Sequence, residues 1–155
     1  MKRPDVALLV CWALVPAALP AQGWRETGIW ATAVASSPAF GGAGVAAWWR
    51  DPLRTRLGLA VAVGAEERAG VAGRIEGMWH FLLDPYRRSG NAIYGGAGLA
   101  LQLTNRGDVE PGVQLVVGVE GAPASGRSGF IELGVGRGAR VAMGMRWRKR
   151  NAPRQ

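Results

Sequence analysis

Few side chains in this sequence of 155 residues are equipped for catalysis or metal binding, because it holds one histidine, His80, and one cysteine, Cys11. A His/Ser pair acts only when the two side chains are within hydrogen-bond reach, and the residue two places after His80 is Leu82. The serines fall in predicted turns or at their edges, at Ser36, Ser37, Ser89, Ser125 and Ser128. A lone cysteine excludes disulfides, and a zinc site lacks its ligands. We therefore predict no catalytic residue, metal or cofactor, and interpret His80 as structural.

Charged residues are the other candidates for chemistry, and six of them share even-numbered positions in otherwise apolar stretches. They are Arg56, Arg74, Glu76, Glu120, Glu132 and Arg146. Buried charges are costly unless they are paired. Three glutamates and three arginines on one face therefore predict an interior ion-pair network. A narrow ion path or a binding site is the alternative use of the same charges.

The elements that position these charges are short and evenly spaced. Turn signals such as Asp51-Pro52, Asp84-Pro85 and Asn105-Arg106-Gly107-Asp108 separate eight segments. The segments cover residues 24–36, 39–50, 54–64, 69–82, 91–103, 111–121, 127–136 and 139–148. Each is close to the ~10 residues of a membrane-spanning strand. Because no long helix pattern, repeat or linker competes with them, one domain built as a meander of hairpins is predicted.

The two faces of these segments differ in polarity when residues are sorted by odd and even number. Over segments three to eight, 29 odd-numbered positions include 23 Val, Leu, Ile, Met, Phe or Trp and no charge. The 27 even-numbered positions hold three such residues, seven charges and 13 Gly or Ala. Small residues make a poor solvent surface, but they leave room for a few long side chains inside an eight-stranded barrel.

The free energy of placing a charge in lipid decides which face points outward. Turning an arginine to the bilayer midplane costs about 2–4 kcal/mol, so the odd-numbered face is predicted to meet lipid and the charged face to line the interior. A soluble, lipocalin-like barrel with its apolar face inward shows the same alternation. That fold, binding a hydrophobic ligand, is the alternative.

Aromatic residues mark one rim of the predicted barrel. Trp49, Trp79, Phe81 and Trp147 have odd numbers and stand at the ends of segments two, four and eight, which share a rim in an up-and-down barrel. Aromatic rings favour the boundary between lipid and water. We interpret these four residues as part of an aromatic girdle.

Residues 27–49 carry no charge and are long enough for a spanning helix. Ser36-Ser37-Pro38 and Gly41-Gly42 interrupt the run near its middle, which favours a hairpin. In that hairpin Glu26, Trp30 and Trp48 face the interior.

The two ends of the chain differ from the segments between them. Residues 1–21 join a short basic start to an apolar run from Val6 to Leu19, which is typical of a secretory signal peptide; an uncleaved anchor helix is the alternative. Residues 149–155 form a basic tail.

The formal charge of +8 does not identify a partner by itself, and predicted export argues against nucleic acid as a partner. Four arginines are assigned to solvated connections, with lipid phosphates as the alternative contact: Arg68, Arg106, Arg137 and Arg140.

With these eight segments and a last strand that runs Arg140-Val-Ala-Met-Gly-Met-Arg-Trp147, the chain resembles the small outer-membrane β-barrels of Gram-negative bacteria, OmpA/OmpX-like. The resemblance implies that residues 22–148 form the barrel, that outer-membrane lipid surrounds it, and that the barrel-assembly machinery reads the last strand at Gly144 and Trp147. Eight residues follow Trp147 here, which departs from that pattern. Some such barrels are lipid-modifying enzymes that use a His and a Ser, for which His80 is the candidate.

The sequence therefore predicts an all-β, eight-stranded antiparallel up-and-down transmembrane β-barrel located in the cell outer membrane. Its expected role is structural or adhesive, with a side-chain-filled interior and no enzymatic activity. A lipid-modifying enzyme and a soluble lipocalin-like barrel are the alternatives from other classes.

Overall fold

The computed structural model describes residues 24–150, and every regular element in that range is a strand. The strands are β1 (Trp24–Ala35), β2 (Phe40–Arg50), β3 (Thr55–Glu66), β4 (Gly70–Leu82), β5 (Asn91–Thr104), β6 (Val109–Gly121), β7 (Arg127–Val135) and β8 (Ala139–Arg150). All eight predicted segments lie within two residues of these bounds. The predicted signal peptide, residues 1–21, lies outside the described residues, as do residues 151–155 of the predicted tail. Lys149 and Arg150 belong to β8.

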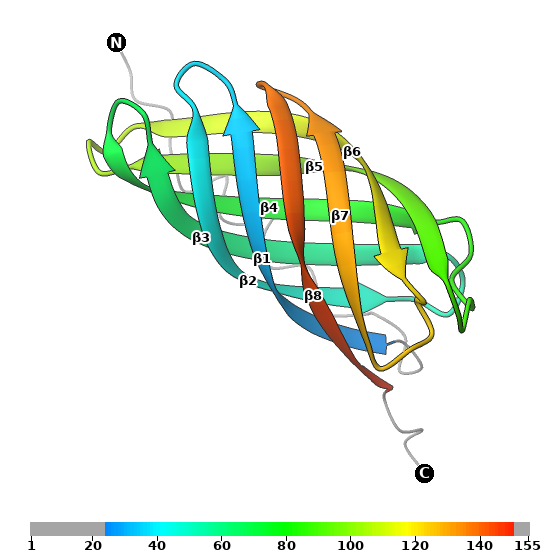
Figure 1. Cartoon of the computed structure of the whole chain (residues 1–155). Coiled ribbons are helices and arrows are strands. Elements are labelled where there is room, and N and C mark those ends of the chain that lie inside the picture. Colours follow the sequence, from blue (N-terminus) through cyan, green and yellow to red (C-terminus); the bar gives the residue numbers. More distant parts are fainter. Residues whose placement is uncertain (1–23, 151–155) are drawn as a thin grey trace.

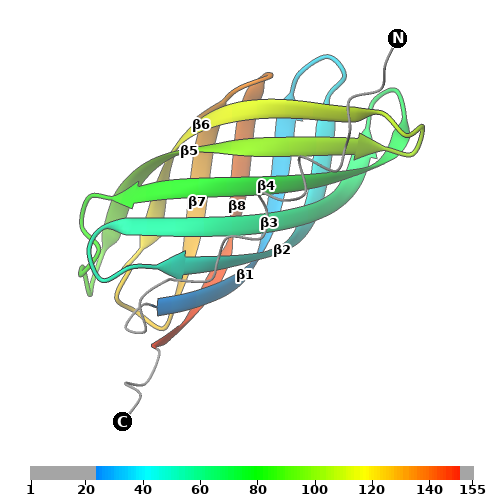
Figure 2. The same ribbon diagram turned by 180° about the vertical axis from the view of Figure 1, so that it is seen from behind.

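The strands form one closed barrel in sequence order, each antiparallel to its neighbours, and β8 closes the barrel by pairing with β1 from Trp24 to Ala35. Figures 1 and 2 show the strong tilt of the strands on the two sides of the barrel. The start of β1 and the end of β8 lie at the same end, which we call the terminal end (Figure 1). The opposite end, with the turns between β1 and β2, β3 and β4, β5 and β6, and β7 and β8, is the distal end. The predicted fold class is confirmed.

The register keeps one face of every strand inside. Each pairing joins residues of equal parity; Val61, for example, lies opposite Val45 on β2 and Ile75 on β4. Because side chains alternate along a strand, even-numbered residues point inward around the whole barrel. A slip of one residue between two strands would turn the charges of one strand outward, and no pairing shows such a slip.

Residues 27–49 form the β1–β2 hairpin, with Ile29 opposite Val45 and Trp30 opposite Gly44. Of the residues that the structure describes, none belongs to a helix with the length and apolarity needed to cross a membrane. Trp30 and Trp48 are buried inside the barrel.

Glycine fits the large interior side chains into a narrow barrel. A Cβ added at Gly58 would clash with the ring of Trp48, and one added at Gly118 would clash with the ring of Tyr94. Both glycines have even numbers and therefore face the interior. The small even-numbered residues of the sequence thus leave space that specific rings from other strands occupy.

Candidate functional site

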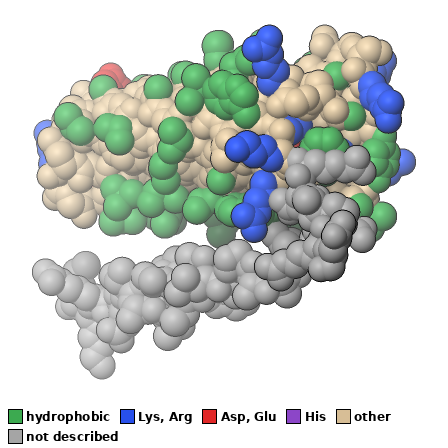
Figure 3. Space-filling model, turned by 90° about the horizontal axis from the view of Figure 1, so that it is seen from below, with side chains coloured by type: hydrophobic (Ala, Val, Ile, Leu, Met, Phe, Trp, Pro, Cys, Tyr) green, Lys and Arg blue, Asp and Glu red, His purple; other side chains and the backbone are tan. Residues whose placement is uncertain are grey.

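The outer wall of the barrel is apolar. Leu57, Val61, Val117 and Met143 are between 42% and 54% exposed, whereas Arg74 and Glu120 are buried inside. Figure 3 shows hydrophobic side chains spread along the length of one face. This polarity contradicts the soluble, lipocalin-like alternative, because that fold needs its apolar face inside.

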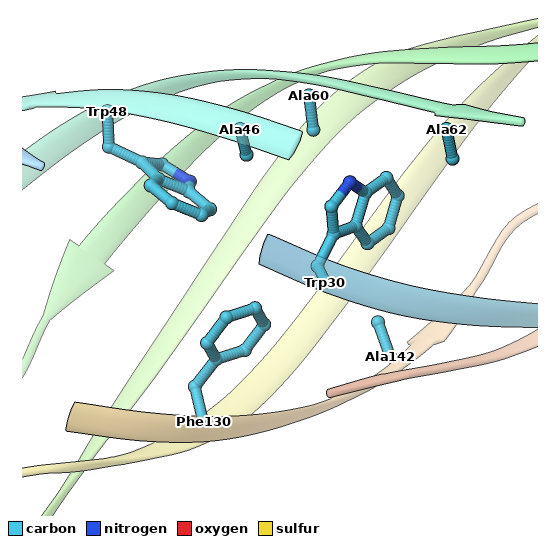
Figure 4. Close-up of a cluster of buried hydrophobic side chains, with 7 residues drawn as sticks. All are labelled: Trp30, Ala46, Trp48, Ala60, Ala62, Phe130 and Ala142. Atoms are coloured by element: carbon cyan, nitrogen blue, oxygen red, sulfur yellow. The ribbon is translucent and has the colours of Figure 1, made fainter. Parts of the chain in front are cut away.

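An apolar layer crosses the interior. Trp30, Trp48 and Phe130 project into the barrel and form a cluster with alanines of β2, β3 and β8 (Figure 4). The rings of Trp48 and Phe130 meet edge to face, with centroids 6.1 Å apart. The indole N–H of Trp30 donates to the carbonyl oxygen of Val61 at 3.3 Å. These contacts fill the interior, where the alanines leave space for the rings.

Six ionisable side chains form what we call the terminal cluster, in the half of the barrel nearest the terminal end. They are Glu26, Arg50, Arg56, Glu120, Arg146 and Arg148, all buried. Arg56 donates twice to Glu120, at 3.0 and 2.6 Å, and Arg146 donates to the same carboxylate at 2.6 Å. Glu120 therefore neutralises guanidinium groups from two other strands.

Arg146, like Arg56, has no exposed surface. Besides Glu120 it donates to Glu132 at 2.9 Å and to the hydroxyl of Tyr94 at 3.2 Å. Its guanidinium carbon lies 3.9 Å from the centroid of the Phe130 ring and 4.6 Å from that of Trp48. Arg146 thus joins the charged residues to the apolar layer, with its cation over ring faces.

A second group, the distal cluster, fills the other half of the interior. It consists of Glu66, Arg74, Glu76, Gln102, Gln114 and Arg140, all buried. Glu76 accepts from Arg74 at 2.6 Å and from Arg140 at 2.8 and 3.2 Å. Arg140 also donates to Glu132 at 3.0 Å. Because Glu132 also accepts from Arg146, it links the two clusters.

The structure brings the six predicted network residues together, but it also adds members. Arg140 corrects the sequence interpretation, which places it in a solvated connection: it is the second residue of β8 and is 4% exposed. Its even number indicates an interior position, but it lies close to the predicted Gly136-Arg137-Gly138 turn and is therefore easily assigned to that turn. Arg50 was missed for a similar reason, because it precedes the Asp51-Pro52 turn.

Arg50 closes the barrel at its terminal end. Its guanidinium donates to the carbonyl oxygens of Pro85 and Pro123, which lie in the connections after β4 and β6. Both prolines are buried. The hydroxyl of Tyr86 donates to the carbonyl oxygen of Pro52. These contacts hold three connections over the terminal mouth.

The distal mouth retains a small cavity of about 20 Å³, lined by residues of β1 and of β4 to β8. Arg74, Gln102, Gln114, Arg137 and Arg140 contribute to its lining. A cavity of this size holds about one water molecule. Four members of the distal cluster, Arg74, Gln102, Gln114 and Arg140, therefore form part of the wall of this cavity.

The predicted girdle residues lie at the terminal end. Trp79, Phe81 and Trp147 are exposed on the outer wall, and Trp49 is partly exposed. They come from β2, β4 and β8, and each stands close to the end of its strand. The structure thus places the four rings along one rim.

His80 lies inside the barrel and not at the lipid interface. It is 1% exposed, its ring is 5.0 Å from that of Tyr94, and its Nε2 is 3.8 Å from a carboxylate oxygen of Glu132. Neither ring nitrogen has a hydrogen-bond partner among the described residues. Within residues 24–150 no serine forms a hydrogen bond with the ring, and no group of side chains there is arranged to hold a metal ion.

A closed eight-stranded barrel with an apolar outer wall and a charged interior is the architecture of a transmembrane β-barrel. No protein-family model and no curated protein matches the chain. The chain is similar to solved structures of small barrels, two of which are described here. The N-terminal β-barrel domain of Pseudomonas aeruginosa OprF has a TM-score of 0.61 and 13% sequence identity, and the match covers 83% of this chain and 100% of that one. Neisserial surface protein A (NspA) has a TM-score of 0.57 and 14% identity, with 81% and 96% covered.

These likenesses confirm, at the level of the fold, the predicted resemblance to small outer-membrane β-barrels. The fold also agrees with the predicted location in the cell outer membrane.

Proposed function

We propose that this chain is an outer-membrane barrel with a structural role, whose interior is closed to ions and solutes. The observation that carries the proposal is the filled interior: two ion-paired clusters and an apolar layer occupy it, and Arg50 fastens connections over the terminal mouth. A conducting barrel needs a continuous aqueous path, and charged side chains that pair with one another across the barrel fill the space of such a path.

The connections at the distal end favour a structural over an adhesive role. They span residues 36–39, 67–69, 105–108 and 136–138. Loops this short offer little surface for a specific protein contact, because standard interfaces involve about 20–30 residues from each partner. The sides of the barrel are the larger surface, and they are apolar.

Conductance measurements test the closed interior. We expect the purified barrel, inserted into planar bilayers, to show no steady current at moderate voltage, because paired charges and packed rings occupy its interior. The location is tested separately: the protein is expected in the outer-membrane fraction, with a folded form that changes mobility on a gel after heating. A reproducible unitary conductance in a preparation that is fully folded by the gel criterion would contradict the closed interior.

The last strand supports a further part of this proposal, that the barrel-assembly machinery reads β8. Trp147 faces outward near the end of β8, and Gly144 faces inward against Phe130 and Trp30. Trp79 is also an outward tryptophan at the terminal end, but it belongs to β4. The two tryptophans therefore form a matched pair.

We expect Trp147→Ala to reduce the amount of folded barrel in cells severalfold and Trp79→Ala to leave it near the wild-type amount. Both changes remove an interfacial ring, so only recognition of the last strand separates them. The heat-modifiable gel band in the membrane fraction measures the outcome. Equal losses in the two variants would show that Trp147 acts only as a girdle residue.

A further inference from the structure

Three cations lie side by side on the outer wall at the terminal end, and we call them the rim cluster. Arg25 on β1 stands opposite Lys149 on β8, and Arg127 on β7 stands opposite Trp147 on β8. Arg25 also stands opposite Trp49 on β2. All three cations are exposed. Their odd numbers put them on the lipid-facing side of three adjacent strands, flanked by the tryptophans of the predicted girdle.

The rim cluster has no counter-charge in the part of the chain that the structure describes. None of its three side chains makes an ion pair or a hydrogen bond among the interactions of residues 24–150. The interior arginines differ, because Arg56, Arg140 and Arg146 each contact carboxylates. The exposed Arg137 at the distal end also has a partner, Glu110, at 3.1 Å. The cations of the rim cluster are thus available to a ligand from outside the chain.

The exposed charges of the two ends are unequal. The terminal end carries six exposed cations and two carboxylates, of which Asp51 is only partly exposed, whereas the distal end carries three exposed cations and three carboxylates, of which Glu110 is only partly exposed. At the terminal end these are Arg25, Arg54, Arg87, Arg88, Arg127 and Lys149, with Asp51 and Asp84. At the distal end they are Arg68, Arg106 and Arg137, with Glu67, Asp108 and Glu110. In Figure 3 most of the visible Lys and Arg side chains lie over the right-hand part of the barrel, toward the terminal end.

We propose that the rim cluster binds the headgroup phosphates of anionic phospholipids in the leaflet at the terminal end. This inference rests on the membrane-spanning barrel proposed above. Tryptophans mark the depth at which hydrocarbon meets headgroups, and the cations stand beside Trp49 and Trp147 at that depth. Neighbouring strands are about 4.8 Å apart, so side chains on three adjacent strands can contact one phosphate together. An arginine donates to two phosphate oxygens at once, and its aliphatic stem packs along the apolar wall.

The chemistry of the surroundings decides between lipid and an acidic protein as the occupant. Thr27 on β1 and Trp147 on β8 follow the rim cluster on the outer wall, and beyond them the wall is apolar, with Ile29 on β1 and Met145 on β8. A ligand with a charged head and an apolar body matches both parts of this surface. A lipid meets that description, because its phosphate reaches the cations while its acyl chains lie along the wall.

Lipid binding by the full-length barrel, folded in detergent, tests the proposal by native mass spectrometry. We expect phosphatidylglycerol to bind more tightly than phosphatidylcholine at low salt. In the variant R25Q/R127Q/K149Q this preference is expected to fall more than tenfold, since each basic residue near an anionic lipid surface contributes about fivefold. The matched control is R68Q/R106Q/R137Q, which removes three exposed cations from the distal end and is expected to keep the preference.

Each outcome decides the question. Equal binding of the two lipids by the wild-type barrel, or equal losses in the two triple variants, overturns the proposal. Where the triple variant does not fold, R127Q and K149Q are measured singly, and an unchanged preference in both overturns it. Binding of polyglutamate in place of phosphatidylglycerol identifies an acidic protein as the occupant and also overturns it. A folded barrel without lipid preference leaves the membrane assignment intact, whereas absence of the protein from the membrane fraction contradicts that assignment.

Discussion

Replacing Arg146 with methionine is expected to lower the free energy of unfolding of the barrel by about 3–5 kcal/mol, the cost of breaking a buried ion pair by removing one partner. Arg146 donates to Glu120 at 2.6 Å and to Glu132 at 2.9 Å. Methionine matches the arginine side chain as far as Nε, so the loss is the guanidinium group with its positive charge and its contacts to the rings of Trp48 and Phe130. The buried carboxylates of Glu120 and Glu132 then each lose one positively charged partner. Urea titration of the barrel in lipid vesicles, followed by the heat-modifiable gel band, measures the change.

The control for this variant is Arg137→Gln. Arg137 also pairs with a glutamate, Glu110, but both side chains are partly exposed. Pairs of this kind contribute about 0.2–1 kcal/mol, so the expected change is several times smaller. Comparable effects of the two substitutions would show that the interior charges are as well solvated as the exposed pair.

A double variant separates the charge of Arg146 from its packing. In R146M/E132Q the carboxylate of Glu132, which has lost Arg146 as a partner, is replaced by a neutral amide. We therefore expect the double variant to be more stable than R146M alone. Glu132 keeps Arg140 at 3.0 Å in the wild type, and therefore the rescue is expected to be partial. A double variant whose loss equals the sum of the two single losses would mean that Arg146 and Glu132 do not interact energetically.

Sequence parity was sufficient to predict the barrel because the register never changes parity from strand to strand. Odd-numbered Leu57 and Met143 meet the outside, and even-numbered Glu76 and Glu120 meet the inside, although they come from four different strands. A bulge in any strand would have reversed the faces beyond it. The Ser36-Ser37-Pro38 turn likewise marked the hairpin between β1 and β2, where the sequence left a helix as the alternative.

The partners within the interior were beyond the reach of the sequence. Arg56 on β3 contacts Glu120 on β6, 64 residues later in the sequence. This pairing depends on the tilt of the strands and on the closure of the barrel. The closure of the terminal mouth was also not predicted. It depends on the backbone carbonyl groups of Pro85 and Pro123. Every residue has such a carbonyl group, so the residue types do not show which ones accept a hydrogen bond.

The membrane assignment itself leads to the second large effect. We expect Val61→Arg to lower the stability of the barrel in lipid by about 2–4 kcal/mol, the cost of an arginine facing lipid at the bilayer midplane. Val61 lies near the middle of β3, on the outer wall, with Val45 and Ile75 as its neighbours on β2 and β4. The guanidinium group at that position is far from both rims, so its side chain reaches headgroups only by distorting the bilayer.

Val71→Arg is the matched control. Val71 is also an exposed valine on the outer wall, but it is the second residue of β4 and lies at the distal rim. An arginine near the interface costs about 0–1 kcal/mol, because its side chain extends into the headgroups. Unfolding in vesicles is therefore expected to rank the variants as wild type, Val71→Arg and then Val61→Arg in order of falling stability. If the two arginines have equal effects, the outer wall of the barrel does not face hydrocarbon, because water would solvate both positions alike.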